Sequence, residues 1–160
     1  MLIRKATMED LDAIAAVEAA CFPAAEAATA AEFADRLAHY ADCFWLLFEG
    51  SELVGFVDGM VTDCADLTDE MYADASLHNP DGKWQMIFGL NTLPQYRCHG
   101  YAAKLVESVI AAARDAGRAG VVLTCKDKLV HYYARFGFVD EGISGSTHGD
   151  VVWRQMRLRF

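Results

Sequence analysis

The sequence has no long hydrophobic run and no recognisable leader. No stretch approaches the roughly twenty consecutive apolar residues that a helix needs to cross a bilayer. The start, MLIRKATMED, has neither the apolar core nor the cleavage site of a signal peptide. We therefore expect a cytoplasmic protein without a membrane partner.

Disulfide and metal patterns are also missing. The five cysteines are an odd number and contain no C-x-x-C pair, so we expect reduced, mostly buried thiols. The five histidines never fall at H-x-H or H-E-x-x-H spacing, which argues against a metal site. The cysteines are Cys21, Cys43, Cys64, Cys98 and Cys125.

The sequence lacks the glycine-rich motifs of two large nucleotide-binding classes. Neither G-x-x-x-x-G-K-[ST] nor G-x-G-x-x-G occurs, which argues against a nucleoside-triphosphate enzyme and against a Rossmann fold. Repeats, low-complexity linkers and composition shifts are absent as well. With 160 residues and 54% hydrophobic content, residues 1–160 are expected to form a single α/β domain with a real core.

Basic residues are scarce in the first half of the chain. Residues 1–82 hold 3 lysines and arginines against 17 acidic residues, whereas residues 83–160 hold 11 against 6. A nucleic-acid binder would be more basic overall than this chain, whose net charge is −9. The acidic half is either a solvated surface or the side that receives a cationic ligand, with an anionic ligand on the other half. Its densest run is Asp58, Asp63, Asp66, Asp69, Glu70, Asp74 and Asp81.

Hydrophobic periodicity and capping residues predict alternating strands and helices. Thr7 to Asp10 and Thr29 to Glu32 are capping-box starts of two helices, and residues 101–116 form a third amphipathic helix before Gly117. A short helix is expected at 127–135, and a loop with room for one helical turn at 63–82. Strands are predicted at 2–5, 43–48, 53–61, 84–92, 120–125, from 136, and at 151–160.

One connection points to an anion. In NTLPQYRCHGYAAKL a strand ends, a short turn with one glycine follows, and an amphipathic helix begins. Such a turn presents bare backbone N–H groups at the positive end of a helix dipole. Gly100 lets the backbone approach a ligand without a Cβ, and Arg97 and Lys104 offer positive charge.

Arg97-Cys-His-Gly-Tyr-Ala102 fits the Arg-x-x-Gly-x-Ala turn of the GCN5-related N-acetyltransferases (GNAT), which the chain resembles over nearly its whole length. Within that superfamily, "GSELVGFVDG", "LTDEMYADASLHNPDG", "YRCHGYAAKL" and "LTCKDKLVHYYARFGF" are most similar to the arylalkylamine (serotonin) N-acetyltransferase branch. The resemblance implies a mixed, mostly antiparallel seven-stranded sheet flanked by about four helices.

The resemblance also implies acetyl-CoA as the co-substrate. The turn and its helix would bind the pyrophosphate, and the strand before them would bond the pantetheine arm through its backbone. A lysine follows the next strand where the family usually has asparagine. The implied acetyl-CoA-binding residues are Leu90, Thr92, Arg97, Cys98, His99, Gly100, Tyr101, Ala102, Lys104 and Lys126.

Three further positions depart from the family pattern. Cys98 stands where the family usually has glycine, so this turn is made with a side chain present. Met86 and Phe88 occupy the positions of the two histidines that serve the amine-acetylating relatives as base through water. Neither side chain takes up a proton, so the base must lie elsewhere.

Tyr133 matches the family's general acid, which protonates the departing thiolate, although a packed aromatic is the alternative. The base stays open between Asp58 and His148, each acting through water. Asp58 shares a strand face with Val54 and Phe56, either at a solvated rim or against a partner. His148 lies in a loop of small residues that either lines the acceptor site or faces solvent.

The function implied is direct acetyl transfer to the primary amine of a small, cationic acceptor, with an arylalkylamine among the candidates. No covalent cysteine intermediate is needed. Two alternatives remain open at this point: acetylation of a peptide or protein amine, and a non-catalytic acyl-CoA-binding sensor domain.

Overall fold

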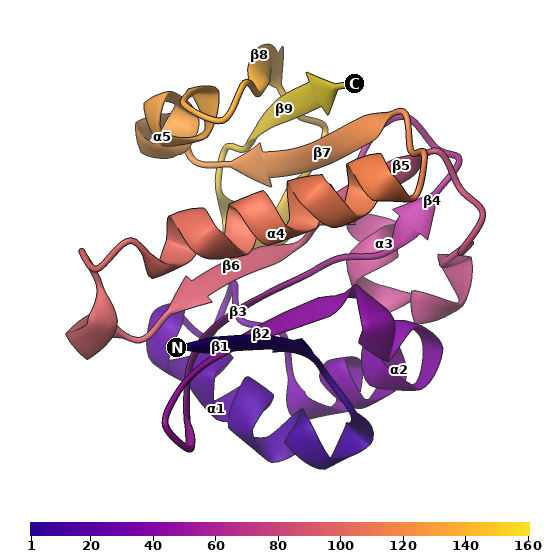
Figure 1. Ribbon diagram of the computed structural model, residues 1–160. Helices are drawn as coiled ribbons and strands as arrows, with labels where there is room; N and C mark the ends of the chain where they lie inside the picture. Colours follow the sequence, from indigo (N-terminus) through magenta and orange to yellow (C-terminus); the bar gives the residue numbers. More distant parts are fainter.

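Two β-sheets form the centre of the structure, a computed structural model that describes residues 1–160 (Figure 1). The first has the strand order β1-β2-β3-β6 and the second the order β4-β5-β7-β9-β8. All neighbouring strands are antiparallel except β5 and β7. The strands are β1 (Leu2–Lys5), β2 (Phe44–Glu49), β3 (Glu52–Asp58), β4 (Val61–Thr62), β5 (Trp84–Ile87), β6 (Gly89–Thr92), β7 (Gly120–Cys125), β8 (Val139–Ile143) and β9 (Arg154–Arg159).

Five α-helices accompany the sheets, and the second of them starts as the sequence predicts. The Thr29 hydroxyl accepts from the Glu32 N–H at 3.2 Å, while the Glu32 carboxylate accepts from the Thr29 N–H at 3.1 Å. This reciprocal pair satisfies two helix-terminal donors. The helices are α1 (Leu11–Cys21), α2 (Ala30–Tyr40), α3 (Asp69–Ala73), α4 (Tyr101–Asp115) and α5 (Val130–Ala134).

The helices cover opposite faces of the first sheet. Alternate residues of a strand point to opposite faces. On β3, Phe56 packs edge-on against Phe33 of α2 with 5.8 Å between ring centroids, whereas a Cβ at Gly55 would lie 3.5 Å from the Leu105 side chain of α4. Thus α1 and α2 lie together on one face and α4 crosses the other (Figure 1).

The chain changes sheets at Phe88. Up to Ile87 it belongs to β5, which pairs with β7, and from Gly89 it belongs to β6, which pairs with β3. Beyond Leu123, β7 therefore no longer pairs with β5, although it still pairs with β9. The edge of β6 that faces away from β3 has no partner strand. The diverging strands leave a gap between β6 and the end of β7 (Figure 1).

The predicted α/β fold class is confirmed, with corrections of detail. The stretch 84–92 is two strands in two sheets, because its neighbours β3 and β7 diverge, so a single seven-stranded sheet is not the arrangement seen. The strand expected from Phe136 starts at Val139, since residues 135–137 continue the turn of α5 through bonds to its carbonyls. The last strand starts at Arg154 rather than Val151.

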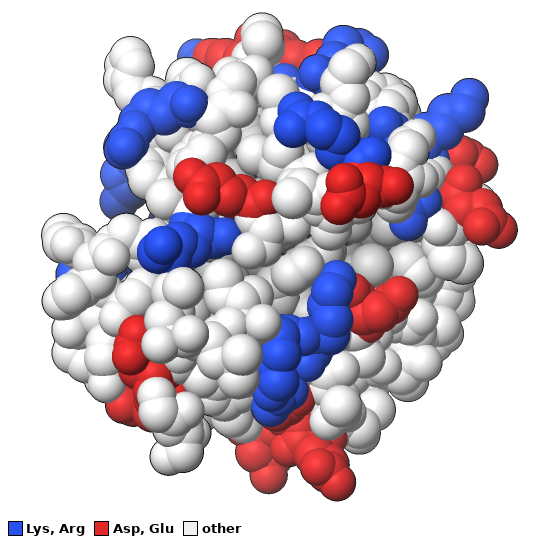
Figure 2. Space-filling model, in the orientation of Figure 1, with Lys and Arg blue, Asp and Glu red and all other residues white.

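Two corrections concern the surface. Only Cys43 and Cys125 are buried, while Cys64 and Cys98 are exposed, so the thiols are not mostly buried; all five are free. On the face shown in Figure 2, acidic and basic side chains are interspersed rather than gathered into one patch of a single sign. None of the helices combines the length and the apolarity that crossing a bilayer requires.

Candidate active site

The turn before α4 has the geometry of an anion site. Gly100 caps the helix with φ 80°, no side chain caps the first N–H groups, and the first turn holds no acidic residue. The backbone donors of Tyr101, Ala102 and Ala103 thus stand at the positive end of a fifteen-residue helix. Cys98 adopts φ 65°, the left-handed region that favours glycine, which accounts for the glycine usual at this position.

The side chains of the turn hold its shape. His99 Nδ1–H donates to the carbonyl oxygens of Tyr96 and Arg97 at 2.9 and 2.8 Å, and its ring stacks on Tyr101. The Tyr101 hydroxyl donates to Glu49 at 2.8 Å. Arg97 Nε–H donates to the Thr92 carbonyl at 3.1 Å, which ties the turn to the end of β6. Lys104 lies exposed on α4, one turn from its start.

The free edge of β6 carries backbone groups that no neighbouring strand bonds. Leu93 N–H bonds the Val54 carbonyl of β3, and antiparallel pairing alternates along the strand. Leu90 and Thr92 therefore direct their N–H and C=O groups away from β3, toward the gap beside β7. The contacts of Cys21 Sγ and Arg97 Nε with the Thr92 oxygen agree with this orientation. An extended ligand arm in the gap would meet backbone donors and acceptors.

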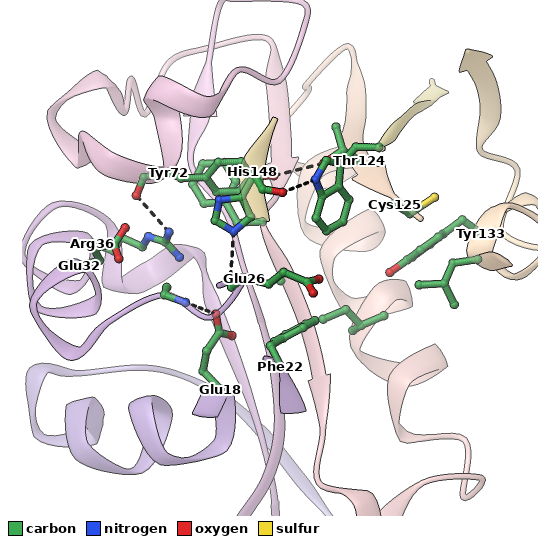
Figure 3. A pocket seen from close by; sticks show the side chains of 16 residues that line it. Glu18, Phe22, Glu26, Glu32, Arg36, Tyr72, Thr124, Cys125, Tyr133 and His148 are labelled. Carbon is green, nitrogen blue, oxygen red and sulfur yellow. Dashed lines mark hydrogen bonds between the residues drawn. The ribbon is translucent and has the colours of Figure 1, made fainter. Parts of the chain in front are cut away.

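A pocket, open at its mouth, occupies the gap between β6 and the end of β7 (Figure 3). One part borders the strand edges, and the other extends between α1, α2 and the loop before β9. The first part is lined by Gly89, Leu90, Thr124, Cys125, Leu129 and Tyr133. The second is lined by Glu18, Phe22, Glu26, Ala28, Glu32, Arg36, Tyr72, Phe88, His148 and Trp153.

Tyr133 presents its hydroxyl to the pocket while its ring is fixed in the core. The ring packs edge-on against Tyr132 and Phe138, and the side chain is 7% exposed. Burial raises the pKa of its phenol well above the usual value, so it stays protonated and able to donate. Burial likewise raises the pKa of the neighbouring Cys125 thiol to about 11, which keeps this thiol from acting as a nucleophile at neutral pH.

His148 forms part of the pocket wall, as one of its two sequence interpretations predicts. Asp69 anchors its loop by accepting bonds from the Ser146 hydroxyl and the Thr147 N–H. The imidazole stacks on Tyr72 with 4.9 Å between centroids, and Nε2–H donates to the Glu26 carbonyl at 2.8 Å. Trp153 Nε1–H donates to the His148 carbonyl at 2.7 Å.

Asp58 meets a partner rather than solvent. Its carboxylate is 1% exposed and forms an ion pair with Arg36 of α2, with 3.1 Å between Nη1 and Oδ2. Burial raises the pKa of Asp58 to about 6, and the Arg36 guanidinium opposes this shift. Arg36 also donates to the Tyr72 carbonyl at 3.1 Å. Arg36 lines the pocket with Asp58 behind it, and the pair holds α2 to β3 and to α3.

Glu18 is a pocket residue that the sequence did not single out. It sits on α1, 6% exposed, and its carboxylate accepts from the Ala28 N–H at 2.8 Å and from Asn91 Nδ2 at 3.1 Å. Burial raises its pKa to about 7, helped by the Asp58 charge and opposed by its hydrogen bonds and Arg36. A glutamate in an alanine-rich helix is expected to face solvent. The burial of Glu18 depends on contacts with residues distant in sequence, so the sequence alone did not indicate it.

The acidic run of residues 58–81, where the charge pattern suggested a cation site, lies outside the pocket. None of its seven members lines the pocket. Asp63 accepts from Lys83 N–H, Asp66 pairs with Arg157, and Asp74 caps a short helix turn, so they support local structure. The pocket's acids come from α1, α2 and their connection. Lys126, expected near acetyl-CoA, is at the pocket rim with its Nζ 2.8 Å from Glu26 Oε1.

The two positions where the relatives carry histidines differ in placement. Phe88 lines the pocket with its ring 4.9 Å from that of Tyr72, while Met86 is fully buried in the core. The sequence did not single out Tyr72 and Thr124 either. Their hydroxyls bond each other at 3.1 Å between the two parts of the pocket, and the part between α1, α2 and the loop before β9 is called the acceptor chamber below. Trp153 was missed as well, although its place after a loop of small residues resembles that of His148.

Comparison with known proteins agrees with this geometry. The sequence pattern described as "Acetyltransferase (GNAT) family" matches residues 11–138. Serotonin N-acetyltransferase of Mesocricetus auratus is 29% identical over 112 residues, which are 69% of this chain and 52% of that relative, so the match spans about half its length.

Two solved structures are similar over nearly the whole fold. The GphF GNAT-like decarboxylase in complex with isobutyryl-CoA has a TM-score of 0.85 and 26% identity, with 99% of each chain covered. The loading GNATL domain of CurA from Lyngbya majuscula has a TM-score of 0.87 and 18% identity, covering 99% of this chain and 96% of that one. With a family pattern that covers most of its length, the chain belongs to the acetyltransferase (GNAT) family.

Proposed function

We propose that this protein is an acetyl-CoA-dependent N-acetyltransferase that moves the acetyl group directly to the primary amine of a small, cationic acceptor. One observation carries the proposal: a single pocket joins the free edge of β6 to the Tyr133 hydroxyl at one end and to a buried carboxylate, Glu18, at the other. The five free thiols support the cytoplasmic location that we also propose.

The residues present fit acetyl-CoA. The uncapped N–H groups of α4 would bind its pyrophosphate, with Arg97 and Lys104 adding positive charge. Leu90 and Thr92 would bond the pantetheine amides from the strand edge, and Lys126 stands at the rim. The Leu90 N–H, directed into the gap, would polarise the thioester oxygen. The reacting carbon would then lie near Tyr133.

The reaction requires two proton movements. The acceptor must lose a proton to become a free amine, whose nitrogen then bonds the acetyl carbon as the C–S bond breaks. Tyr133 would donate its proton to the leaving sulfur, which departs as the coenzyme A thiol. No group of the protein is acylated, in keeping with the protonated state of Cys125.

The acceptor chamber indicates a small molecule. The rings of Tyr72, His148 and Trp153 close one side, and glutamates lie on the other, so a cation with an apolar or aromatic body matches both walls. This arrangement supports a small amine over a peptide, whose chain must leave the chamber in two directions unless its amino terminus is the acceptor.

A second candidate is decarboxylation of a carboxyacyl-CoA. It is favoured by the full-length similarity to a GNAT-like decarboxylase, together with Met86 and Phe88 in place of the two histidines. The bond between the α-carbon and the carboxylate would break, its electrons would pass to the α-carbon, and a proton would replace the released CO₂. The hydroxyls of Tyr72 and Thr124, which bond each other at 3.1 Å, are the donors available beside the thioester.

One assay separates the candidates. Purified protein is incubated with acetyl-CoA and a panel of cationic, neutral and peptidyl amines, while thiol release is followed; malonyl-CoA is incubated separately and analysed by mass spectrometry. Release that depends on a small cationic amine supports the proposal. Acetyl-CoA formed from malonyl-CoA, with no amine-dependent release, supports the decarboxylase. Saturable acetyl-CoA binding without turnover of either thioester would leave the sensor domain.

A further inference from the structure

Four carboxylates stand at or just behind the acceptor chamber, and three of them are already engaged. Asp58 is paired with Arg36 at 3.1 Å, and Glu26 with Lys126 at 2.8 Å. Glu32 completes the capping box of α2 with Thr29. A guanidinium or an ammonium in contact with a carboxylate stabilises its charged form and lowers its affinity for a proton, and Arg36 opposes the effect of burial on Asp58 in this way.

Glu18 is the fourth and differs in its partners. Both of its oxygens are held, Oε2 by the Ala28 N–H at 2.8 Å and Oε1 by Asn91 Nδ2 at 3.1 Å, yet neither partner carries a charge. The Glu18 side chain forms no salt bridge. The two hydrogen bonds therefore fix the direction of the Glu18 carboxylate, and no salt bridge lowers its affinity for a proton.

The position of Glu18 matches the open strand edge. A Cβ built on Gly89, the first residue of β6, would lie 3.6 Å from Glu18 Oε1. Gly89 has no side chain, so this residue does not screen the Glu18 carboxylate from the start of β6. Glu18 and Tyr133 line the same pocket, so an acceptor nitrogen between them has an acid on one side and a base on the other (Figure 3).

We propose that Glu18 takes one proton, through a bridging water, from the ammonium group of the amine substrate. The inference rests on the proposed N-acetyl transfer. The proton passes from nitrogen to carboxylate, the nitrogen lone pair forms the new C–N bond, and the C–S electrons leave with the sulfur, which takes its proton from Tyr133. Proton exchange with solvent through the pocket mouth restores both side chains.

The surroundings of Glu18 tune it for this role. Facing it are Asp58 from β3, Arg36 from α2 and Asn91 from β6, with the Ala28 N–H after α1 and the Cys21 thiol one turn along α1. With burial as the main cause, the pKa of Glu18 rises to about 7. The carboxylate is thus partly ionised at neutral pH and a stronger base than an exposed glutamate, as proton transfer requires.

The test compares Glu18→Gln with Glu9→Gln. Glu9 precedes α1, is exposed and lies outside the pocket, so Glu9→Gln controls for the exchange of a carboxylate for an amide. With a strongly basic amine near pH 7, Glu18→Gln is expected to lower kcat by roughly 10²-fold or more, and to remove the acidic limb near pH 7, so that the rate instead follows the amine's own loss of a proton. Glu9→Gln should stay within a few-fold of the wild type.

A weakly basic acceptor distinguishes a base from a merely structural residue. An aromatic amine is already unprotonated at neutral pH, so Glu18→Gln should acetylate it at close to the wild-type rate. The deficit with the basic amine should also shrink as pH rises toward about 10, where that amine loses its own proton. An acetyl-CoA-induced rise in melting temperature equal to that of the wild type shows that the variant is folded.

The outcomes separate the two proposals. If the wild type acetylates amines and Glu18→Gln retains the same kcat and acidic limb, Glu18 is not the proton acceptor. The proposed N-acetyl transfer is then unaffected. An equal loss with basic and weakly basic amines also overturns the base. Should Glu18→Gln not fold, Glu18→Asp must show lowered kcat with the acidic limb retained. If the wild type acetylates no amine, both proposals fall together.

Discussion

The Nε2–H of His148 donates to the carbonyl oxygen of Glu26 at 2.8 Å, and this bond joins the loop before β9 to the connection between α1 and α2. A carbonyl oxygen only accepts, so the proton is on Nε2, and the Nδ1 of the neutral ring keeps its lone pair. The same bond closes one side of the acceptor chamber. His148 is therefore both part of the wall and a remaining candidate for the base.

We predict that His148→Ala raises KM for the amine about tenfold or more, because the wall loses its stack on Tyr72 and its tie to Glu26. With Glu18 as proton acceptor, the acidic limb of kcat should persist. His131→Ala, at an exposed position on α5, is the control. Loss of the limb in His148→Ala, with the limb retained in Glu18→Gln, would make the histidine the base.

The second prediction concerns the general acid. Tyr133→Phe removes one oxygen from the pocket and leaves the edge-on packing against Tyr132 and Phe138 in place. We expect kcat to fall by roughly 10²–10⁴-fold while acetyl-CoA affinity is retained. Tyr132→Phe, the adjacent and half-buried tyrosine, should change kcat by less than a few-fold. Full activity in Tyr133→Phe would show that the thiolate leaves without this proton.

Much of the fold could be predicted because its signals are local. The Thr29–Glu32 capping box, the turn at Gly100 and the stripe of α4 are each encoded within a few residues, and the structure has them where expected. The break at Phe88 could not be predicted, since an apolar run reads as one strand. It becomes two only because β3 and β7 diverge on either side.

The site divides in the same way. The β6 edge, the turn and Tyr133 lie on segments whose order resembles the family, and the β6 edge and Tyr133 border one pocket, whereas no residue of the turn lines it. Glu18 and the Arg36–Asp58 pair depend on contacts between elements up to 73 positions apart, which no local pattern encodes. Net charge along the chain was misleading for this reason, because it does not say which acids face inward.

A third prediction follows from the two buried carboxylates. Burial raises the pKa of Glu18 from 4.5 to about 7 and that of Asp58 from 3.8 to about 6. Between about pH 4 and 7 the folded protein therefore binds more protons than the unfolded chain, and the free energy of unfolding falls as pH rises. Asp10, Asp69 and Glu141 have lowered pKa values, so their opposite effect lies at lower pH, whereas burial lowers the pKa of His78 and offsets part of the loss within the window.

Denaturant unfolding of the ligand-free protein at several pH values measures this slope. At about 1.4 kcal/mol per pKa unit, Glu18 should contribute a loss on the order of a few kcal/mol across the window, and Glu18→Gln should remove that part. Glu32→Gln shows the effect of deleting another pocket carboxyl group. A wild-type stability that rises steadily from pH 5 to 7 would contradict the prediction.

The last prediction separates the two left-handed residues of the anion-binding turn. Cys98 at φ 65° carries a Cβ, which costs about 1–2 kcal/mol, while glycine would cost roughly 0.4–1 kcal/mol of extra freedom in the unfolded chain. Cys98→Gly should therefore raise the melting temperature by about 1–3 °C and leave kcat within tenfold, since direct transfer uses no thiol. A trapped acetyl-enzyme or a large loss of activity would indicate a covalent cysteine mechanism instead.

Gly100 at φ 80° should respond in the opposite sense. Gly100→Asp adds backbone strain and places a carboxylate at the N-terminus of α4, where it repels the pyrophosphate and occupies its N–H donors. Acetyl-CoA at a hundredfold excess over Kd stabilises a folded protein by about 2.7 kcal/mol, and this rise in melting temperature should be strongly reduced in Gly100→Asp but present in Cys98→Gly. Equal ligand-induced shifts in both variants and the wild type would place the phosphate site elsewhere, because the turn is the one element these two substitutions share.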